Sequence, residues 1–158
     1  FSEYSEIQVK GPALFLGYVH GIDLDPCRDD EGFFSTGDCG YIEDDLLFIS
    51  GRRDLMFISG GENIYPEEIE QVLNEMVPVS IVVPVPHERY GMRPIAFVGL
   101  EEPSILLIEK IKAHLQKNLP SFKHPDHILP WPSQIPKHKP PRASLELIAR
   151  NWINERSP

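Results

Sequence analysis

The sequence predicts an α+β fold in which helices pack on a small sheet, preceded by a β-rich segment. Apolar residues in the first fifty positions form short or alternating runs between breakers, which is typical of strands and turns. After that the patterns follow the order strand, helix, strand, strand, helix, and this order favours a compact α+β domain. We therefore predict a boundary at Asp54, between residues 1–53 and residues 54–158.

The β-rich segment is expected to hold four short strands, separated by Gly11-Pro12, Gly32 and Asp44-Asp45. The predicted strands are residues 7–9, 14–18, 40–42 and 46–50. The segment is too short to bury a good core of its own, so it needs a larger partner. Because the chain begins in the middle of a strand pattern, we expect it to be a piece of a longer polypeptide.

The second half is predicted from periodicity and capping. Gly60-Gly61 reads as a tight turn after a strand, and Pro66 suits the first position of a helix because no hydrogen bond is lost there. Ser104 is expected to cap a second helix. That helix would carry an apolar stripe of Ile105, Ile108, Ile111, Leu115 and Leu119. The predicted strands are residues 55–58, 79–85 and 95–100, and a last helix is expected from about Ser144, after a Pro-rich stretch at 120–141.

Composition narrows the classes of function. With 41% hydrophobic and 25% charged residues, the 158-residue chain has the balance of a globular protein. A net charge of −9 argues against a nucleic-acid surface, which needs clustered Lys and Arg. No apolar run approaches the roughly 20 residues that cross a bilayer, so we expect no membrane span. Two cysteines in a chain with no secretory signal fit a reducing cytosol, so we expect a cytoplasmic protein. Cys27 and Cys39 lack the spacing of a zinc site, and no metal site is expected.

One stretch with candidate chemistry is Thr36-Gly37-Asp38, which follows two aromatic residues. We expect it to place a carboxylate at the end of a strand, on a turn. An ionised carboxylate there can accept hydrogen bonds from two adjacent hydroxyls, such as those of a ribose. A plain surface turn would have the same residues, and that alternative stays open.

Two further stretches carry candidate groups. Residues 50–70 centre on Gly60-Gly61, where positive φ and close approach of a ligand are possible. An ordinary hairpin turn is the alternative. Residues 136–145 present lysines on a proline-stiffened loop before a helix. Such a loop could deliver a cation to a phosphate–acyl centre, although most lysines of this kind are simply solvated.

In this order the stretches resemble the adenylate-forming superfamily of acyl-CoA synthetases, luciferases and peptide-synthetase adenylation domains. The resemblance covers nearly the whole chain, including residues 6–18, which look like the strand and turn ahead of the family's Thr-Gly-Asp. Residues 51–68, 90–96 and 139–145 are similar to the o-succinylbenzoate–CoA ligases of menaquinone biosynthesis. The resemblance implies the C-terminal part of an AMP-forming acid–CoA ligase, with the β-rich end of a large N-terminal domain followed by a mobile C-terminal domain.

The resemblance also implies a role for each candidate residue. Family enzymes join a carboxylate to ATP as an acyl-adenylate and then transfer the acyl group to the thiol of coenzyme A. Asp38 would bind the ribose hydroxyls, Arg52 would assist at the nucleotide, and Asp54 would be the hinge between the two half-reactions. The remaining assignments are Lys139 as the catalytic lysine of adenylation, and Gly60, Gly61 and Glu62 as the border of the CoA channel.

Two departures from the family pattern limit these assignments. Many members carry Gly-Lys where this chain has His138-Lys139, so Lys137 is a rival; Lys139 is preferred because Arg142 and Leu145 follow it at the family spacing. The phosphate loop and the acyl pocket of the family are not found in these residues. Mg²⁺ and the phosphates would therefore be held by the N-terminal domain, and we expect the chain alone to be inactive.

The expected partners are a small-molecule carboxylic acid, ATP, CoA and the chain's own N-terminal domain, while a homo-oligomer is left open. Two other functions also stay open. One is an adenylation domain of a peptide synthetase, whose thiol belongs to a carrier protein, and the other is a non-catalytic binding module. At the level of single residues, Asp54 could serve only to pair with Arg53.

Overall fold

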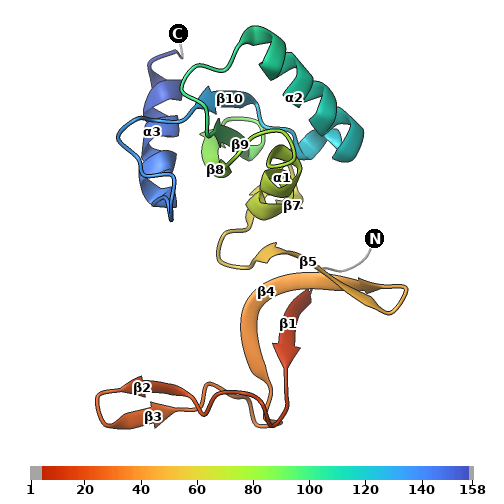
Figure 1. The fold of residues 1–158 in the computed structure, drawn as a ribbon. Coiled ribbons are helices and arrows are strands. Elements are labelled where there is room, and N and C mark those ends of the chain that lie inside the picture. Colours follow the sequence, from red (N-terminus) through yellow and green to blue (C-terminus); the bar gives the residue numbers. More distant parts are fainter. Residues whose placement is uncertain (1–4, 157–158) are drawn as a thin grey trace. The chain divides into compact units, whose positions relative to one another are not determined.

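The computed structural model describes residues 5–156 and divides the chain into two compact units, Phe1–Asp54 and Leu55–Pro158 (Figure 1). Each unit has its own sheet. The outermost residues of both predicted domains, 1–4 and 157–158, lie outside the described residues.

The first unit is built around strand β4, which pairs antiparallel with β1 on one edge and with β5 on the other. The β4–β5 hairpin turns at Asp44 and Asp45, which both have positive φ, as a two-residue turn of this kind requires. A separate two-stranded ribbon joins β2 and β3. The strands are β1 (Ser5–Val9), β2 (Tyr18–His20), β3 (Asp23–Asp25), β4 (Phe34–Glu43) and β5 (Leu46–Arg52).

The strand predicted at residues 14–18 is wrong, because only Tyr18 is in a strand. Phe15 instead packs edge-on against the rings of Tyr18 and Phe34, so its apolar character reflects aromatic contacts and not sheet pairing. Gly17 passes so close to the backbone of Asp25 that an added Cβ would stand 2.1 Å from its carbonyl oxygen. Among the described residues of this unit only one apolar side chain, Cys39, is buried, so the unit has little core of its own.

The second unit has a five-stranded sheet with β9 at its centre. One edge of β9 pairs with β8 along its whole length, from Ser80 opposite Val98 to His87 opposite Gly91. The other edge pairs in parallel with β10. At Gly91 this edge also pairs antiparallel with β6, which in turn pairs antiparallel with β7. The strands are β6 (Phe57–Ser59), β7 (Glu62–Ile64), β8 (Ser80–His87), β9 (Gly91–Val98) and β10 (His127–Pro130).

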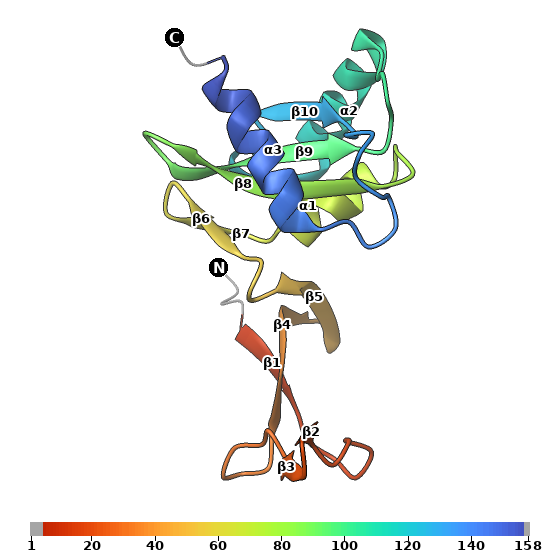
Figure 2. The ribbon, with the colours of Figure 1, turned by 90° about the vertical axis from the view of Figure 1, so that its left-hand side faces the viewer.

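Helices cover both faces of this sheet, α1 and α2 on one side and α3 on the other (Figures 1 and 2). Pro66 opens α1 as predicted, with Glu67 and Glu68 in the first turn. The Ser104 hydroxyl caps α2 by accepting a hydrogen bond from the N–H of Leu107 at 3.2 Å. The helices are α1 (Pro66–Leu73), α2 (Ile105–Asn118) and α3 (Arg142–Asn154), with a short 3-10 turn, η1 (Ser121–Lys123), before β10.

Alternation along β8 and β9 divides the apolar side chains between two cores, as expected for strands buried on both faces. The core under α1 and α2 is formed by Phe57, Ile64, Ile69, Leu73, Val77, Val82, Ala96, Val98, Ile111 and Leu115. The core under α3 is formed by Ile81, Val83, Val85, Ile95, Phe97, Leu129, Trp131, Leu145 and Ala149.

The predicted α+β fold is confirmed, with shifted ends and three missed strands, of which β3 lies in the first unit. Strands β7 and β10 were not predicted as such, and β9 begins at Gly91 instead of Ile95. The apolar stripe of α2 is wrong at Ile105, which is 85% exposed as the first residue of the helix, and Leu107 packs against the core instead. Helix α3 begins at Arg142, two residues before the predicted start.

Two leucines on α3 give a matched test of the core under that helix. Leu145 is fully buried whereas Leu147 is 60% exposed. Replacing Leu145 by Ala should lower the free energy of unfolding by about 2–5 kcal/mol, because it leaves a cavity. Leu147→Ala should change the free energy of unfolding by less than about 0.5 kcal/mol. Urea unfolding followed by tryptophan fluorescence reports on this unit, because both tryptophans, Trp131 and Trp152, belong to it. Equal losses would contradict the placement of α3.

Candidate functional site

The first unit brings together the three candidates Asp38, Arg52 and Asp54. Asp38 and Arg52 are direct partners across the β4–β5 pairing. Arg52 Nη1 lies 3.4 Å from Asp38 Oδ1 and donates to the carbonyl oxygen of Thr36 at 3.0 Å, while Nε donates to Asp54 Oδ1 at 3.1 Å. The guanidinium therefore bridges the predicted ribose-binding carboxylate and the predicted hinge.

A bulge in β4 shapes this cluster. The pairing of β1 with β4 changes register between Glu6 and Gln8, opposite Thr36-Gly37-Asp38. Thr36 Oγ1 donates to the carbonyl of Ile7 at 2.9 Å and accepts from the N–H of Asp38 at 3.0 Å. The motif thus lies inside a strand and not on a turn at its end, so that part of the expectation is wrong.

The backbone at position 37 favours glycine. Its φ is +78°, and a Cβ there would stand 2.8 Å from Arg52 Nη2. Any side chain would displace the guanidinium that Asp38 faces. The glycine of the motif therefore serves the close approach of Arg52, in a backbone conformation that other residues rarely adopt.

The charged side chains of the cluster are partly exposed to solvent. The side chains of Asp38, Arg52 and Asp54 are 38%, 46% and 68% exposed. The hydrogen bond and charge of Asp54, and then the charge of Asp38, raise the pKa of the Arg52 guanidinium above its ordinary value. Exposed ion pairs of this kind exchange readily with solvent or a ligand. Asp54 does not pair with Arg53, as the alternative supposed; Arg53 pairs with Glu6 at 2.5 Å.

In the second unit, Gly60-Gly61 forms the two-residue turn of the β6–β7 hairpin. Ser59 pairs with Glu62, and the φ values of +61° and +92° are those of a type I′ turn. The hairpin alternative is therefore correct as a description of the backbone. The turn is also held from the side, because Gly60 N donates to the Tyr90 carbonyl at 2.9 Å.

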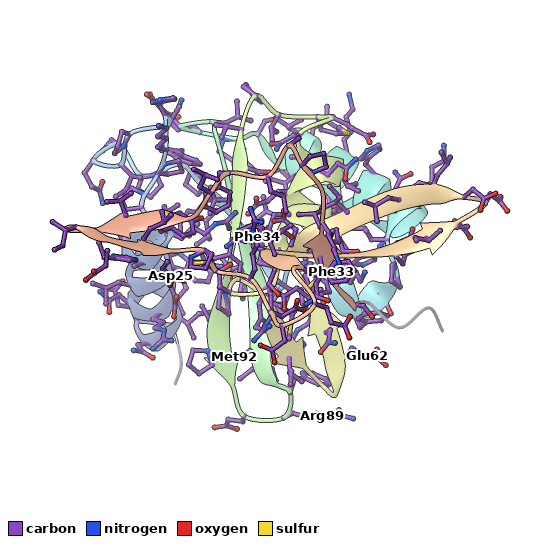
Figure 3. All side chains as sticks on the ribbon, turned by 90° about the horizontal axis from the view of Figure 1, so that it is seen from below. Asp25, Phe33, Phe34, Glu62, Arg89 and Met92 are labelled. Carbon is purple, nitrogen blue, oxygen red and sulfur yellow. The ribbon has the colours of Figure 1, made fainter. Side chains whose placement is uncertain are left out.

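A cleft of about 440 Å³ opens beside this turn. Besides Ser59, Gly60 and Glu62 it is lined by His87, Tyr90, Arg93, Ser121, Phe122 and Asp126. Figure 3 labels two groups of this region, Glu62 on the β6–β7 hairpin and Arg89, which extends outward from the β8–β9 loop. Part of the predicted glycine turn therefore lines a cleft whose other residues are polar or aromatic.

Arg93 is the best-held residue of the cleft, and sequence reasoning missed it. Its guanidinium donates to Asp126 Oδ1 at 2.6 and 2.9 Å, and to the carbonyls of Phe122 and His124 at 2.8 and 2.9 Å. Nη1 also lies 3.3 Å from Ser59 Oγ. The sequence signal that could have found it is an arginine in the middle of an otherwise apolar strand.

The two rival lysines differ in what holds them. Lys137 Nζ donates to the Gly99 carbonyl at 3.1 Å. Lys139 is exposed, and within residues 5–156 its amine has no hydrogen-bond or ion-pair partner. Its backbone is also unusual, with φ at +49° immediately before a proline.

Residues 5–156 contain no group of three or more His, Cys, Asp or Glu side chains placed to hold a metal ion. In the same range no helix is long and apolar enough to cross a membrane.

Residues 68–140 match the family model of the AMP-binding enzyme C-terminal domain. This stretch is therefore similar to the C-terminal domain of AMP-binding enzymes. This confirms the resemblance predicted from the motifs, including its likeness to o-succinylbenzoate–CoA ligases.

Similar proteins are much longer than this chain. A 2-succinylbenzoate–CoA ligase of Listeria monocytogenes is 38% identical over 154 residues, covering 96% of the chain and 31% of the relative. One from Haemophilus influenzae is 40% identical over 135 residues, covering 84% of the chain and 30% of the relative. The structure of the o-succinylbenzoate CoA synthetase (MenE) of Bacillus subtilis with the acyl-adenylate OSB-AMP superimposes with a TM-score of 0.76 at 29% identity. The superposition covers 91% of this chain and 30% of the synthetase. The chain thus spans about 30% of the length of these relatives.

The type I′ turn can be tested with two substitutions at Gly60. A Cβ at this position would lie 3.2 Å from Tyr90 Cδ1 in either case, so the variants differ in backbone preference. Gly60→Ala should lower the free energy of unfolding by about 1 kcal/mol more than Gly60→Asn, because alanine resists positive φ and Asn-Gly favours this turn. Urea unfolding of both variants measures the difference. An alanine variant as stable as the asparagine one would contradict the turn geometry.

Proposed function

We propose that this chain is the C-terminal portion of an AMP-forming acid–CoA ligase whose acid is 2-succinylbenzoate. The observation that carries the proposal is the Asp38–Arg52–Asp54 cluster, in a chain that aligns over most of its length with enzymes named for this reaction. The cluster combines an accessible carboxylate with a planar cation, which suits a ribose and its attached phosphate.

In the first half-reaction an oxygen of the acid attacks the α-phosphorus of ATP. The bond between the α- and β-phosphates breaks, pyrophosphate leaves, and the acyl-adenylate remains. Asp38 would accept hydrogen bonds from the ribose hydroxyls, and Arg52 would donate to sugar or phosphate oxygens. Lys139 would donate to the carboxylate and phosphate oxygens, where negative charges must approach each other.

In the second half-reaction the thiol of CoA attacks the acyl carbon. The bond from this carbon to the phosphate oxygen breaks, AMP leaves, and the thiol gives up its proton. Gly60 and Gly61 would let the CoA arm pass close to the backbone, and Glu62 would border its path. Asp54 would be the hinge, and its exposed pairing with Arg52 is weak enough to exchange during the motion.

Lys139 is preferred over Lys137 because the two amines differ in their hydrogen bonding. The Lys137 amine already donates to the Gly99 carbonyl, and moving it would leave that acceptor unpaired. Lys139 presents an amine that nothing in the described chain engages.

The triphosphate, Mg²⁺ and the acid need groups that these units do not assemble. No described cluster of carboxylates suits Mg²⁺. We therefore assign Mg²⁺, the β- and γ-phosphates and the acyl pocket to residues outside these 158, in the larger protein that the length of the relatives implies.

Replacing Lys139 tests the proposed reaction in the full-length enzyme. Wild type should catalyse ATP–pyrophosphate exchange that depends on 2-succinylbenzoate. Lys139→Ala should lower the exchange rate by about 10²–10³-fold, as expected when a group that stabilises transition-state charge is lost. The matched variant Lys137→Ala should keep most of the activity.

Three outcomes of this experiment would overturn parts of the proposal. Wild type that exchanges with no acid tested would remove the ligase function. Exchange with another aromatic or aliphatic acid only would remove the substrate. Full activity of Lys139→Ala, with loss in Lys137→Ala, would transfer the catalytic role to Lys137.

The carboxylate of Asp38 should control nucleotide affinity. Asp38→Ala removes charge-assisted hydrogen bonds to the ribose, each worth about 1.5–3 kcal/mol, so the KM for ATP should rise by about 10- to 100-fold. Asp30→Ala removes an exposed carboxylate from the same unit and should leave the KM unchanged. An equal KM in the two variants would contradict the assignment of Asp38.

A further inference from the structure

A buried ion pair joins α1 to the start of α3. Glu70 is 8% exposed, and its two carboxylate oxygens accept hydrogen bonds from Arg142 Nη1 and Nη2 at 2.6 and 2.8 Å. Oε1 also accepts from the N–H of Val82 at 2.7 Å, and Arg142 Nη1 donates to the Val82 carbonyl at 3.0 Å. Glu70 and Arg142 therefore bind each other, and both also bind the backbone of Val82.

The outer edge of β8 explains why this arrangement is needed. Within the described chain β8 has a strand neighbour, β9, on one edge. Val82 is buried, so its outward N–H and C=O groups would lose hydrogen bonds to water without gaining any from a strand. An unpaired buried polar group costs about 1–3 kcal/mol. Glu70 satisfies the N–H and Arg142 the C=O, so the pair takes the place of a missing strand.

The pair also fixes one end of the lysine loop. Arg142 is the first residue of α3, and only Pro140 and Pro141 separate it from Lys139. Proline rings fix φ, so the link from the partly buried Arg142 guanidinium to Lys139 is short and stiff. On the other side, the bond from Lys137 to the Gly99 carbonyl holds the loop.

The backbone of Lys139 needs such support. A non-glycine residue with φ near +50° is disfavoured, and the proline that follows restricts it further. Conformations of this kind persist where the surrounding structure determines them. The two anchors, at Lys137 and at Arg142, supply that constraint.

We propose that Glu70 and Arg142 are positioning residues for adenylation, which hold the start of α3 so that Lys139 is presented in one place. This rests on the proposed catalytic role of Lys139. In this proposal neither residue touches the nucleotide or the acid; both act through the position of Lys139. Their loss should therefore impair the half-reaction that needs Lys139 and spare the transfer to CoA.

The chain offers a matched control on the same helix. Glu68, also on α1, forms an ion pair with buried Lys123 in η1. This pair ties α1 to the 3-10 turn. Glu68→Gln weakens the packing of α1 without touching the lysine loop.

The experiment compares Glu70→Gln, Arg142→Lys and Glu68→Gln in the full-length enzyme. Adenylation is measured as acid-dependent ATP–pyrophosphate exchange, and transfer as thioester formation from preformed 2-succinylbenzoyl-adenylate and CoA. Glu70→Gln and Arg142→Lys should lower exchange by about 10- to 100-fold, as expected for a catalytic group displaced by about 1 Å. Transfer should stay within about threefold of wild type, and Glu68→Gln should change the two rates by the same factor. Lysine keeps the charge of Arg142 but loses its two-pronged geometry, which makes Arg142→Lys the mildest variant.

Thermal melts of all variants separate positioning from folding. The proposal is overturned if folded Glu70→Gln and Arg142→Lys enzymes lose both half-reactions in the same ratio as Glu68→Gln. It is also overturned if they exchange like wild type, or if even Arg142→Lys does not fold, because the pair then serves stability alone. Lys139→Ala distinguishes this failure from failure of the function itself. If that variant loses exchange while the pair variants keep it, only the positioning role falls.

Discussion

Strand β9 is the constraint on which the second unit depends, because both its edges and both its faces are occupied. β8 pairs along one edge, β10 and β6 share the other, and buried side chains alternate between the core under α1 and α2 and the core under α3. The loops that carry the candidate residues leave this frame at defined points. Gly60-Gly61 lies at the end of β6, beside the start of β9, and the Lys139 loop leads from β10 into α3.

The candidate chemistry is divided between the two units. The first unit assembles Asp38, Arg52 and Asp54 at a bulge whose positive φ at Gly37 favours glycine, and the second carries the glycine turn and the lysine loop. In the proposed reaction Asp38, Arg52 and Lys139 act in the first half-reaction, whereas the glycine turn acts in the second. The exposed Arg52–Asp54 ion pair lies within the first unit, which ends at Asp54.

Some elements have a local sequence signal and could be predicted, whereas others have none. Pro66, Ser104 and Gly60-Gly61 act on their own neighbours, so the helix starts and the hairpin turn followed from sequence alone. Strand β10, in a proline-rich stretch, and the polar start of β9 depend on pairing with distant residues, which no local pattern records. The motif residues were predictable through family resemblance, while the bulge at Gly37 was not. Glu70 had a signal that was overlooked: with Pro66, Ile69 and Leu73 it completes an i, i+3, i+4, i+7 face that is otherwise apolar and buried.

The central claim is that Asp38 and Lys139, from different units, act on the same nucleotide. A structure of the full-length enzyme with ATP and 2-succinylbenzoate, or with a stable analogue of the acyl-adenylate, tests it most directly. The account predicts an Asp38 carboxylate oxygen within about 3 Å of the ribose hydroxyls and Lys139 Nζ within about 3 Å of a phosphate or acyl oxygen. A nucleotide bound away from Asp38, or contacted by Lys137 while Lys139 stays in solvent, would contradict the account.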